Sequence, residues 1–286
     1  EMTLAAIEHG KHILCEKPMA MNVAEAVEMT AAVVRKPTLA LIDHELRFQP
    51  GRQAAYKMLR DGVIGKVRHT KIIFQAPHRG DPNIRWNWWS DSWVGGGALG
   101  AIVSHIIDSF NWFRDTDVAS VFCQLQTHIK QRPGSDGEMR AVTSDDESNM
   151  LLRFHDSELT NDATGLVSVS MTEYPKYKNR LEFYGSAGAI RIDHIGEVYL
   201  AKAGDDDWKQ VDVPLTANIP GVADTGFARG FMDFAPHIVD AIRTGTAGGV
   251  GDAVALLQPL DAPAECQHDA RAFTSEDLRQ RARVQA

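Results

Sequence analysis

A charged pair follows a short apolar run near the start of the chain, in the segment Glu16-Lys17-Pro18. The run Ile13–Cys15 is typical of a buried strand, and it delivers both charges onto the carboxyl end of that strand. Pro18 ends the strand and keeps Lys17 out of the helical region. Charge at the carboxyl end of a strand that leads into a helix marks the usual ligand site of an α/β sheet. Lys17 is therefore the first candidate for chemistry, with a plain surface lysine as the alternative.

A histidine and an aspartate three residues apart, His105 and Asp108, lie in the apolar stretch 98–113, whose spacing predicts a helix. Histidine suits proton transfer because its pKa lies near working pH. The alternative is a core or interface histidine satisfied by a backbone carbonyl. Asp108 lies on the same side of the helix, where it could orient His105 or have a structural role only.

Two polar residues, His44 and Arg47, come directly after a second predicted strand at 38–43. Between these two strands, Asn22 with Glu25 three residues on predicts the start of the helix Val23–Val34. Ligands of open α/β sheets bind at the carboxyl ends of the strands. His44 and Arg47 are therefore candidates for substrate or cofactor contact. A structural role is the alternative for both.

A long polar and aromatic loop is predicted at 77–93, and long loops in compact domains are often functional. Arg85, Trp86 and Trp88 lie in it. Indoles stack on the apolar faces of sugars, and arginine binds carboxylates or hydroxyls. These three residues are therefore candidates for substrate binding, with hydrophobic anchoring of the loop as the alternative.

The glycine-rich segment 95–100 matches the dinucleotide pattern GxGxxG letter for letter. That pattern needs a buried strand before it, and the tryptophan-rich stretch 85–93 is not one. We therefore reject a pyrophosphate loop here. The glycines are instead expected to let the backbone pass close to a ligand and to open the helix that carries His105.

In order and spacing, these segments resemble the Gfo/Idh/MocA oxidoreductases. The resemblance is carried by residues 4–12 with Glu16-Lys17-Pro18, by His44-Glu45-Leu46-Arg47-Phe48-Gln49-Pro50, by the glycines of 95–100, and by His105-Ile106-Ile107-Asp108. Each motif is weak alone, and their order makes the resemblance specific. It is good over the front of the chain and poor beyond residue 245, where Pro259 and Pro263 interrupt the pattern.

The resemblance implies a dehydrogenase that uses NAD or NADP and acts on sugars, inositols and related polyols. The resemblance implies that Lys17 holds the substrate hydroxyl and stabilises the negative charge on its oxygen as the hydride leaves. The histidine at 105 takes or gives the hydroxyl proton. A cis peptide before Pro18 is also implied, and Glu16 would orient Lys17 or lie against the cofactor, or be merely exposed.

The implied contacts fall into two sets. The cofactor-binding residues are Glu16, Lys17, Pro18, His44 and Arg47. The substrate-binding residues are Lys17, Arg85, Trp86, Trp88, His105 and Asp108, with Lys17 and His105 as the catalytic pair.

One position departs from the family pattern. The family often has an aspartate four residues before the histidine, and here that position is Ala101. Either His105 works with Lys17 alone, or another group such as His44 helps, or the activity is altered. Two rival functions therefore stay open. One is an NAD-dependent glycosidase of the same superfamily, and the other is a non-catalytic ligand sensor on a dehydrogenase scaffold.

The predicted fold is α/β followed by α+β, in two domains. Helix, strand, helix and strand over 1–43 predict the C-terminal part of a Rossmann domain. At about 30 residues per βαβ unit, about 80–100 residues with the glycine-rich loop are expected upstream. The chain alone is then expected to bind cofactor poorly and to be inactive. Residues 44–286 predict a substrate-binding domain with a mostly antiparallel sheet, helices on one face, and an open face that supports a homo-oligomer.

The second domain is predicted to contain a helix at 49–60, a strand at 66–75, a mobile loop at 131–143 and a helix at 227–243. Further strands are predicted at 118–127, 147–154, 165–172, 180–184, 189–193 and 197–201.

The composition describes an ordinary globular protein, with 286 residues, 44% hydrophobic and 24% charged. A net charge of −8 disfavours a nucleic-acid partner, and the lack of a long apolar run disfavours a membrane partner. No signal peptide is visible, and no residue cluster has the spacing of a metal site. Cys15, Cys123 and Cys266 never form a CxxC pair, which favours reduced thiols in the cytoplasm.

Overall fold

The computed structural model describes residues 1–34, 36, 38–114 and 116–245. The expectations about Pro259, Pro263 and Cys266 lie outside these residues. Among the described helices, none combines the length and the apolar character that a membrane span requires. Cys15 and Cys123 are free thiols, and burial raises the pKa of both, that of Cys123 to about 11.

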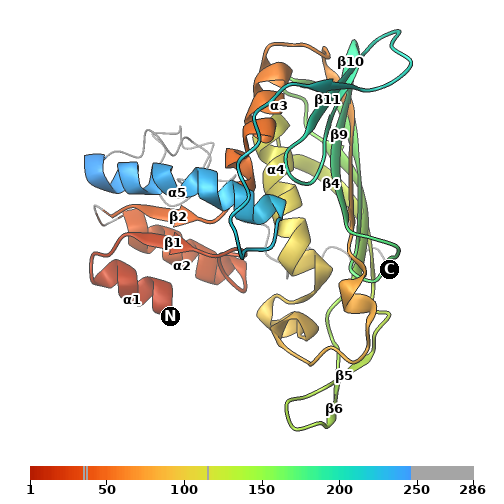
Figure 1. The fold of residues 1–286 in the computed structure, drawn as a ribbon. Helices are drawn as coiled ribbons and strands as arrows, with labels where there is room; N and C mark the ends of the chain where they lie inside the picture. The colour runs from red at the N-terminus through yellow and green to blue at the C-terminus, as the bar shows by residue number, and fades with distance from the viewer. Residues whose placement is uncertain (35, 37, 115, 246–286) are drawn as a thin grey trace.

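The chain begins with a small parallel sheet between layers of helices (Figure 1). β1 pairs with β2 in parallel, from Ile13 opposite Ala40 to Cys15 opposite Ile42. α1 and α2 cover one side of this sheet and α5 covers the other. The bounds are α1 Met2–Glu8, β1 Ile13–Cys15, α2 Val23–Val34, β2 Ala40–Ile42 and α5 Gly226–Thr244.

α2 begins as the sequence predicts. The N–H of Glu25 donates to Oδ1 of Asn22 at 3.0 Å, and the Glu25 carboxylate accepts the N–H of Met21 at 3.1 Å. These contacts satisfy backbone donors that an α-helix leaves unpaired at its first turn.

Side chains in and just before β2 alternate between the two helical layers, as strand geometry requires. Ala40 and Ile42 pack in one apolar cluster with α1 and α2, whereas Leu39 and Leu41 pack in another with α5. Since α5 comes from the far end of the described chain, the two units predicted from the sequence share a core here. The domain boundary after residue 43 remains a prediction.

Eight further strands form one mixed sheet, in the order β12-β11-β10-β9-β3-β8-β7-β4 (Figure 1). β3 and β8 run parallel, and the other neighbouring pairs are antiparallel, which confirms the predicted fold class. α3 and α4 cover one face of this sheet. The bounds are α3 Pro50–Arg60, β3 Val67–Gln75, α4 Ser104–Arg114, β4 Val118–Gln126, β7 Glu147–Phe154, β8 Thr160–Ser170, β9 Lys178–Gly185, β10 Gly188–Ile192, β11 Val198–Lys202 and β12 Lys209–Val211.

The main core lies between α4 and the sheet. Phe110 and Phe113 of α4 are fully buried, and their rings contact those of Phe154 and Phe183 from the sheet, with centroids 5.7 and 4.9 Å apart. Burying aromatic rings of this size is a dominant source of folding free energy. This packing fixes α4, and therefore His105, relative to the sheet.

The stretch 131–143 is not a mobile loop, so that prediction is wrong. It forms a hairpin of β5, Gln131–Pro133, and β6, Met139–Ala141. Pro133 stands at the end of its strand, where the lost N–H donor is tolerated, and Gly137 adopts a positive φ of 85° in the turn. Turn residues mark the tip of an edge hairpin as readily as a loop, which explains the error.

The predicted long loop at 77–93 consists largely of short 3-10 turns: η2 Pro77–Gly80, η3 Trp88–Ser90 and η4 Ser92–Val94. Asn87 and Asp91 accept the N–H groups of Trp89 and Trp93, at 3.1 and 2.9 Å. Such local caps hold the segment without regular secondary structure.

Candidate active site

Lys17 reaches from the end of β1 to the beginning of the helix that carries His105. The peptide bond between Lys17 and Pro18 is cis, as the resemblance implied. Lys17 Nζ donates a hydrogen bond to the carbonyl oxygen of Ala101 at 2.8 Å. Burial lowers the pKa of Lys17, and the nearby carboxyls of Glu45, Glu16 and Asp43 oppose that shift. The two ends of the predicted site are therefore joined by a direct contact.

The helix that carries His105 begins with a π-helical segment, η5, Leu99–Val103, and continues as α4. A helix is present where the sequence predicts one, at 98–113, but its first turn is π-helical rather than α-helical. π-helical turns are rare and are frequently found at functional sites. Ala101 lies within η5 and is buried. Its backbone carbonyl accepts the hydrogen bond from the Lys17 ammonium.

His105 lies one turn after Ala101 and is 4% exposed. Burial holds the pKa of His105 well below its usual value, and the positive charges of Lys17, His44 and Arg52 lower it further. Its ring lies edge-on to that of His44, with the centroids 6.0 Å apart. The imidazole is therefore neutral at physiological pH and able to accept a proton.

The carboxylate of Asp108 contacts Arg47 and His44. It accepts a hydrogen bond from Arg47 Nε at 2.8 Å and a second from the Arg47 guanidinium, and it lies 3.6 Å from His44 Nε2. Burial lowers the pKa of His44, and the Asp108 carboxylate partly opposes that shift. Asp108 thus fixes Arg47 and His44, and His44 in turn contacts His105.

Two carboxyls beside Lys17, those of Asp43 and Glu45, were not predicted from the sequence. Both are buried, and their charges act on each other. Burial raises the pKa of Asp43 to about 6 and that of Glu45 to about 8, with neighbouring negative charge as the second cause in each case. The signal in the sequence was their position, on either side of His44 directly after the second strand.

Trp86, which follows Arg85 in the chain, contacts the β5–β6 hairpin, and this hairpin projects from one end of the molecule (Figure 1). Trp86 donates from its backbone N–H to the Pro133 carbonyl at 2.8 Å and from its indole to the Ala141 carbonyl at 2.9 Å. Trp88 is 48% exposed. In the described residues, no hydrogen bond or ring contact connects these three side chains to Lys17 or His105, and their role in substrate binding remains a prediction.

The glycine run at 95–100 brings backbone close to the site. A Cβ on Gly95 would lie 3.6 Å from the Pro18 ring, and one on Gly100 would collide with the Gly95 carbonyl. The residues before Gly95 form the turns η3 and η4, so the strand that a dinucleotide loop needs does not precede it. The run therefore packs η5 against the Lys17–Pro18 segment.

Two sequence models of one family match this chain. The model described as an oxidoreductase family with an NAD-binding Rossmann fold matches residues 1–44, and the GFO/IDH/MocA C-terminal domain matches residues 52–191. The chain belongs to the Gfo/Idh/MocA oxidoreductase family.

Curated relatives include an uncharacterized oxidoreductase of Synechocystis, 31% identical over 66% of this chain and 50% of the relative. Levoglucosan dehydrogenase of Pseudarthrobacter phenanthrenivorans is 30% identical over 72% of this chain and 55% of the relative. The chain spans about half the length of these two relatives.

Solved structures share the fold. An oxidoreductase domain protein from Kribbella flavida is 26% identical with a TM-score of 0.78, covering 100% of this chain and 75% of that one. A complex of levoglucosan dehydrogenase with NADH and levoglucosan has the same TM-score at 24% identity, covering 100% and 75%.

Proposed function

We propose that the protein containing this chain transfers a hydride between a nicotinamide cofactor, NAD or NADP, and a hydroxyl-bearing carbon of a sugar, inositol or related polyol. The observation that carries the proposal is the contact of Lys17 Nζ with the Ala101 carbonyl, one turn before the neutral imidazole of His105. We place this activity in the cytoplasm, where the thiols of Cys15 and Cys123 stay reduced.

In the proposed reaction, the ammonium of Lys17 donates a hydrogen bond to the substrate oxygen. A positive charge fixed at that point stabilises the negative charge that develops on the oxygen as the hydride leaves the adjacent carbon. Because Lys17 is held by the Ala101 carbonyl, little reorganisation is needed when the substrate binds.

His105 takes the proton of the same hydroxyl onto a ring nitrogen. The neutral ring can accept this proton because burial and the charge of Lys17 keep it unprotonated beforehand. The hydroxyl thereby becomes a carbonyl, having lost a proton to His105 and a hydride from its carbon. In the reverse direction, the protonated ring returns the proton to the oxygen.

The edge of the small sheet fits a nicotinamide cofactor, which supplies the hydride acceptor when bound. The carboxyl ends of β1 and β2 lie side by side, and dinucleotides bind at this edge of open α/β sheets. His44 Nδ1 is buried there without a hydrogen-bond partner among the described residues. Glu16, Lys17, Pro18 and His44 would contact the cofactor, and Arg47 would position His44 through Asp108.

The test is to supply the protein with NAD or NADP and a panel of sugars and inositols, and to follow the absorbance of the reduced cofactor. The proposal predicts a cofactor-dependent increase with at least one substrate. Release of an aglycone without net reduction of the cofactor would indicate the glycosidase instead. Cofactor binding without turnover on any member of the panel would favour the ligand sensor and contradict the proposal.

We further propose a homo-oligomer formed through the bare face of the large sheet. Phe122 of β4 lies opposite Leu151 of β7, which lies opposite Leu166 of β8, and both Phe122 and Leu151 are 58% exposed. Adjacent apolar side chains on an uncovered face are typical of a self-association surface. In the oligomer, this row of side chains in one chain would pack against the same row in a second copy.

This surface makes a testable prediction. Leu151→Glu places a charge in the centre of the row, so we expect the oligomer to dissociate into monomers without loss of fold. Light scattering coupled to gel filtration measures the change in mass. Arg153→Glu is the control, because it changes charge on the same strand at an exposed site beyond the apolar row. An unchanged mass for Leu151→Glu would rule out this face.

A further inference from the structure

A polar cavity is lined by residues of the 77–93 segment, of β5 and of the stretch 142–146. It is small and partly open to solvent. Arg79, Arg132, Trp89, Ser144 and Asp146 are among the residues that line it. None of these residues was singled out from the sequence, and the proposed oxidoreductase reaction uses none of them.

Arg132 contributes one buried N–H donor that is unpaired within the described part of the chain. It is 2% exposed, and its two terminal nitrogens donate to the carbonyls of Asp81 and Arg79. Its Nε is buried and has no hydrogen-bond partner among the described residues. A buried N–H donor without an acceptor costs about 1–3 kcal/mol, so a ligand that accepts it would be stabilised here.

Arg79 contributes a whole guanidinium. It is 8% exposed and stacks over the Trp89 ring at 4.9 Å, and it donates no hydrogen bond to any residue that the structure describes. Burial lowers the pKa of Arg79 to about 10, and the positive charge of Arg132 lowers it further. The two arginines therefore repel each other, the charge of Asp146 partly offsets that repulsion, and an anion bound between them would offset it further.

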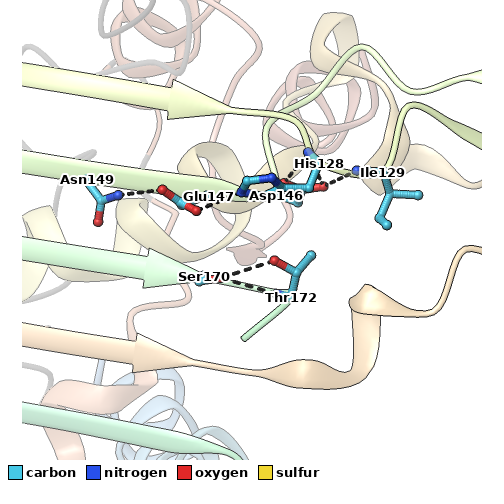
Figure 2. A network of polar contacts seen from close by, with 7 residues as sticks. All are labelled: His128, Ile129, Asp146, Glu147, Asn149, Ser170 and Thr172. Carbon is cyan, nitrogen blue, oxygen red and sulfur yellow. Dashed lines mark hydrogen bonds and ion pairs between the residues drawn. The ribbon is translucent and has the colours of Figure 1, made fainter. Parts of the chain in front are cut away.

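The carboxylates around the cavity are occupied by backbone groups. Figure 2 shows Asp146, which accepts the N–H of His128 with both oxygens, at 2.8 and 2.9 Å, and the N–H of Ile129 at 2.9 Å. Asp145 accepts the N–H of Leu99 at 2.7 Å. Asp146 acts on Arg79 and Arg132 through its charge, and among the described residues the Nε–H of Arg132 remains unpaired.

We propose that this cavity is a binding site for a small oxyanion, either inorganic phosphate or a carboxylate. The planar fork of Arg79 and the Nε–H of Arg132 would both donate to its oxygens. Arginine suits this role because its donors match the spacing of oxygens in phosphates and carboxylates. The size of the cavity restricts the ligand to one such group. This inference does not depend on the proposed function.

The test uses the chain of residues 1–286 and its thermal unfolding midpoint in phosphate, acetate or chloride at equal ionic strength. At a tenfold excess of ligand over its dissociation constant, we expect the midpoint to rise by about 2–4 °C relative to chloride. A higher midpoint in phosphate alone identifies phosphate as the ligand. A higher midpoint in both phosphate and acetate shows that the site also binds a carboxylate. Equal midpoints in all three salts would overturn the proposal.

A variant separates this site from general salt effects. Arg79→Gln should abolish the rise, and it should still fold because the Arg79 guanidinium donates no hydrogen bond within the described protein. Arg68→Gln removes the same charge from an exposed position and should keep the full rise. If Arg79→Gln retains the wild-type response, the anion binds elsewhere and the assignment fails. Isothermal titration of phosphate into both variants gives an independent measure of the same difference.

Discussion

Replacing Lys17 or His105 by alanine lowers the turnover of the proposed polyol substrate by about two to four orders of magnitude. Lys17→Ala removes the ammonium that holds the substrate oxygen, and His105→Ala removes the group that takes the hydroxyl proton. Because the charge on the reacting oxygen and the transfer of its proton develop in the transition state, we expect a large part of the loss in kcat. The measurement is steady-state kinetics of each variant of the full-length protein that contains this chain, with the best substrate of the panel.

Two controls accompany this prediction. Lys11→Ala removes an exposed lysine from the loop before β1 and should leave turnover unchanged. Circular dichroism and the unfolding midpoint of each variant establish that the fold persists, with His105→Gln available if the alanine variant proves unstable at its buried position. A near-normal rate in a folded Lys17 or His105 variant would remove that residue from the mechanism.

Glu45→Gln should make the folded chain less sensitive to pH. In the fold, the pKa of Glu45 is raised to about 8 from an ordinary value of 4.5, so folding takes up a proton between these two values. The free energy of unfolding therefore falls as pH rises through this window, with a slope of about 1.4 kcal/mol per pH unit for a full proton. The neutral amide of glutamine removes this proton uptake.

Urea unfolding of the native chain and the variant from pH 5 to pH 9 measures the effect. We expect Glu45→Gln to have the shallower profile and the higher stability of the two at the alkaline end. Glu28→Gln removes an exposed carboxylate from α2 and should follow the native profile. If native chain and Glu45→Gln give parallel profiles, Glu45 is ionised in the fold and the buried Asp43–Glu45 pair does not hold a proton.

Most of the fold could be predicted because apolar periodicity and local caps act over short distances. The strand Ile13–Cys15 and the helix Val23–Val34 have the bounds expected from their apolar runs and from the Asn22–Glu25 cap. The β5–β6 hairpin could not be predicted, because its stability comes from Arg132 and from carbonyls distant in the chain. The first turn of the His105 helix became π-helical for a similar reason, since Lys17 and the glycine run pack against it.

The candidate site was predicted in part. Charge at the end of a strand located Lys17, and a histidine in an apolar helix located His105. The salt bridge of Asp108 with Arg47 was not predicted, because it joins residues 61 positions apart, a distance over which sequence spacing carries no information. Asp43 and Glu45 were missed because a sequence does not reveal which carboxyls are buried, and Arg79 and Arg132 were missed for the same reason.

The proposed reaction requires that the Lys17 ammonium and the His105 imidazole face one centre. Nuclear magnetic resonance titration of the His105 ring in the chain of residues 1–286 tests it without any need for turnover. We expect a His105 pKa below 6.5 in the native chain and a higher one in Lys17→Met, which keeps the length of the side chain and removes its charge. Lys11→Met should leave the value unchanged. A His105 pKa that is the same with and without the Lys17 charge would contradict the account.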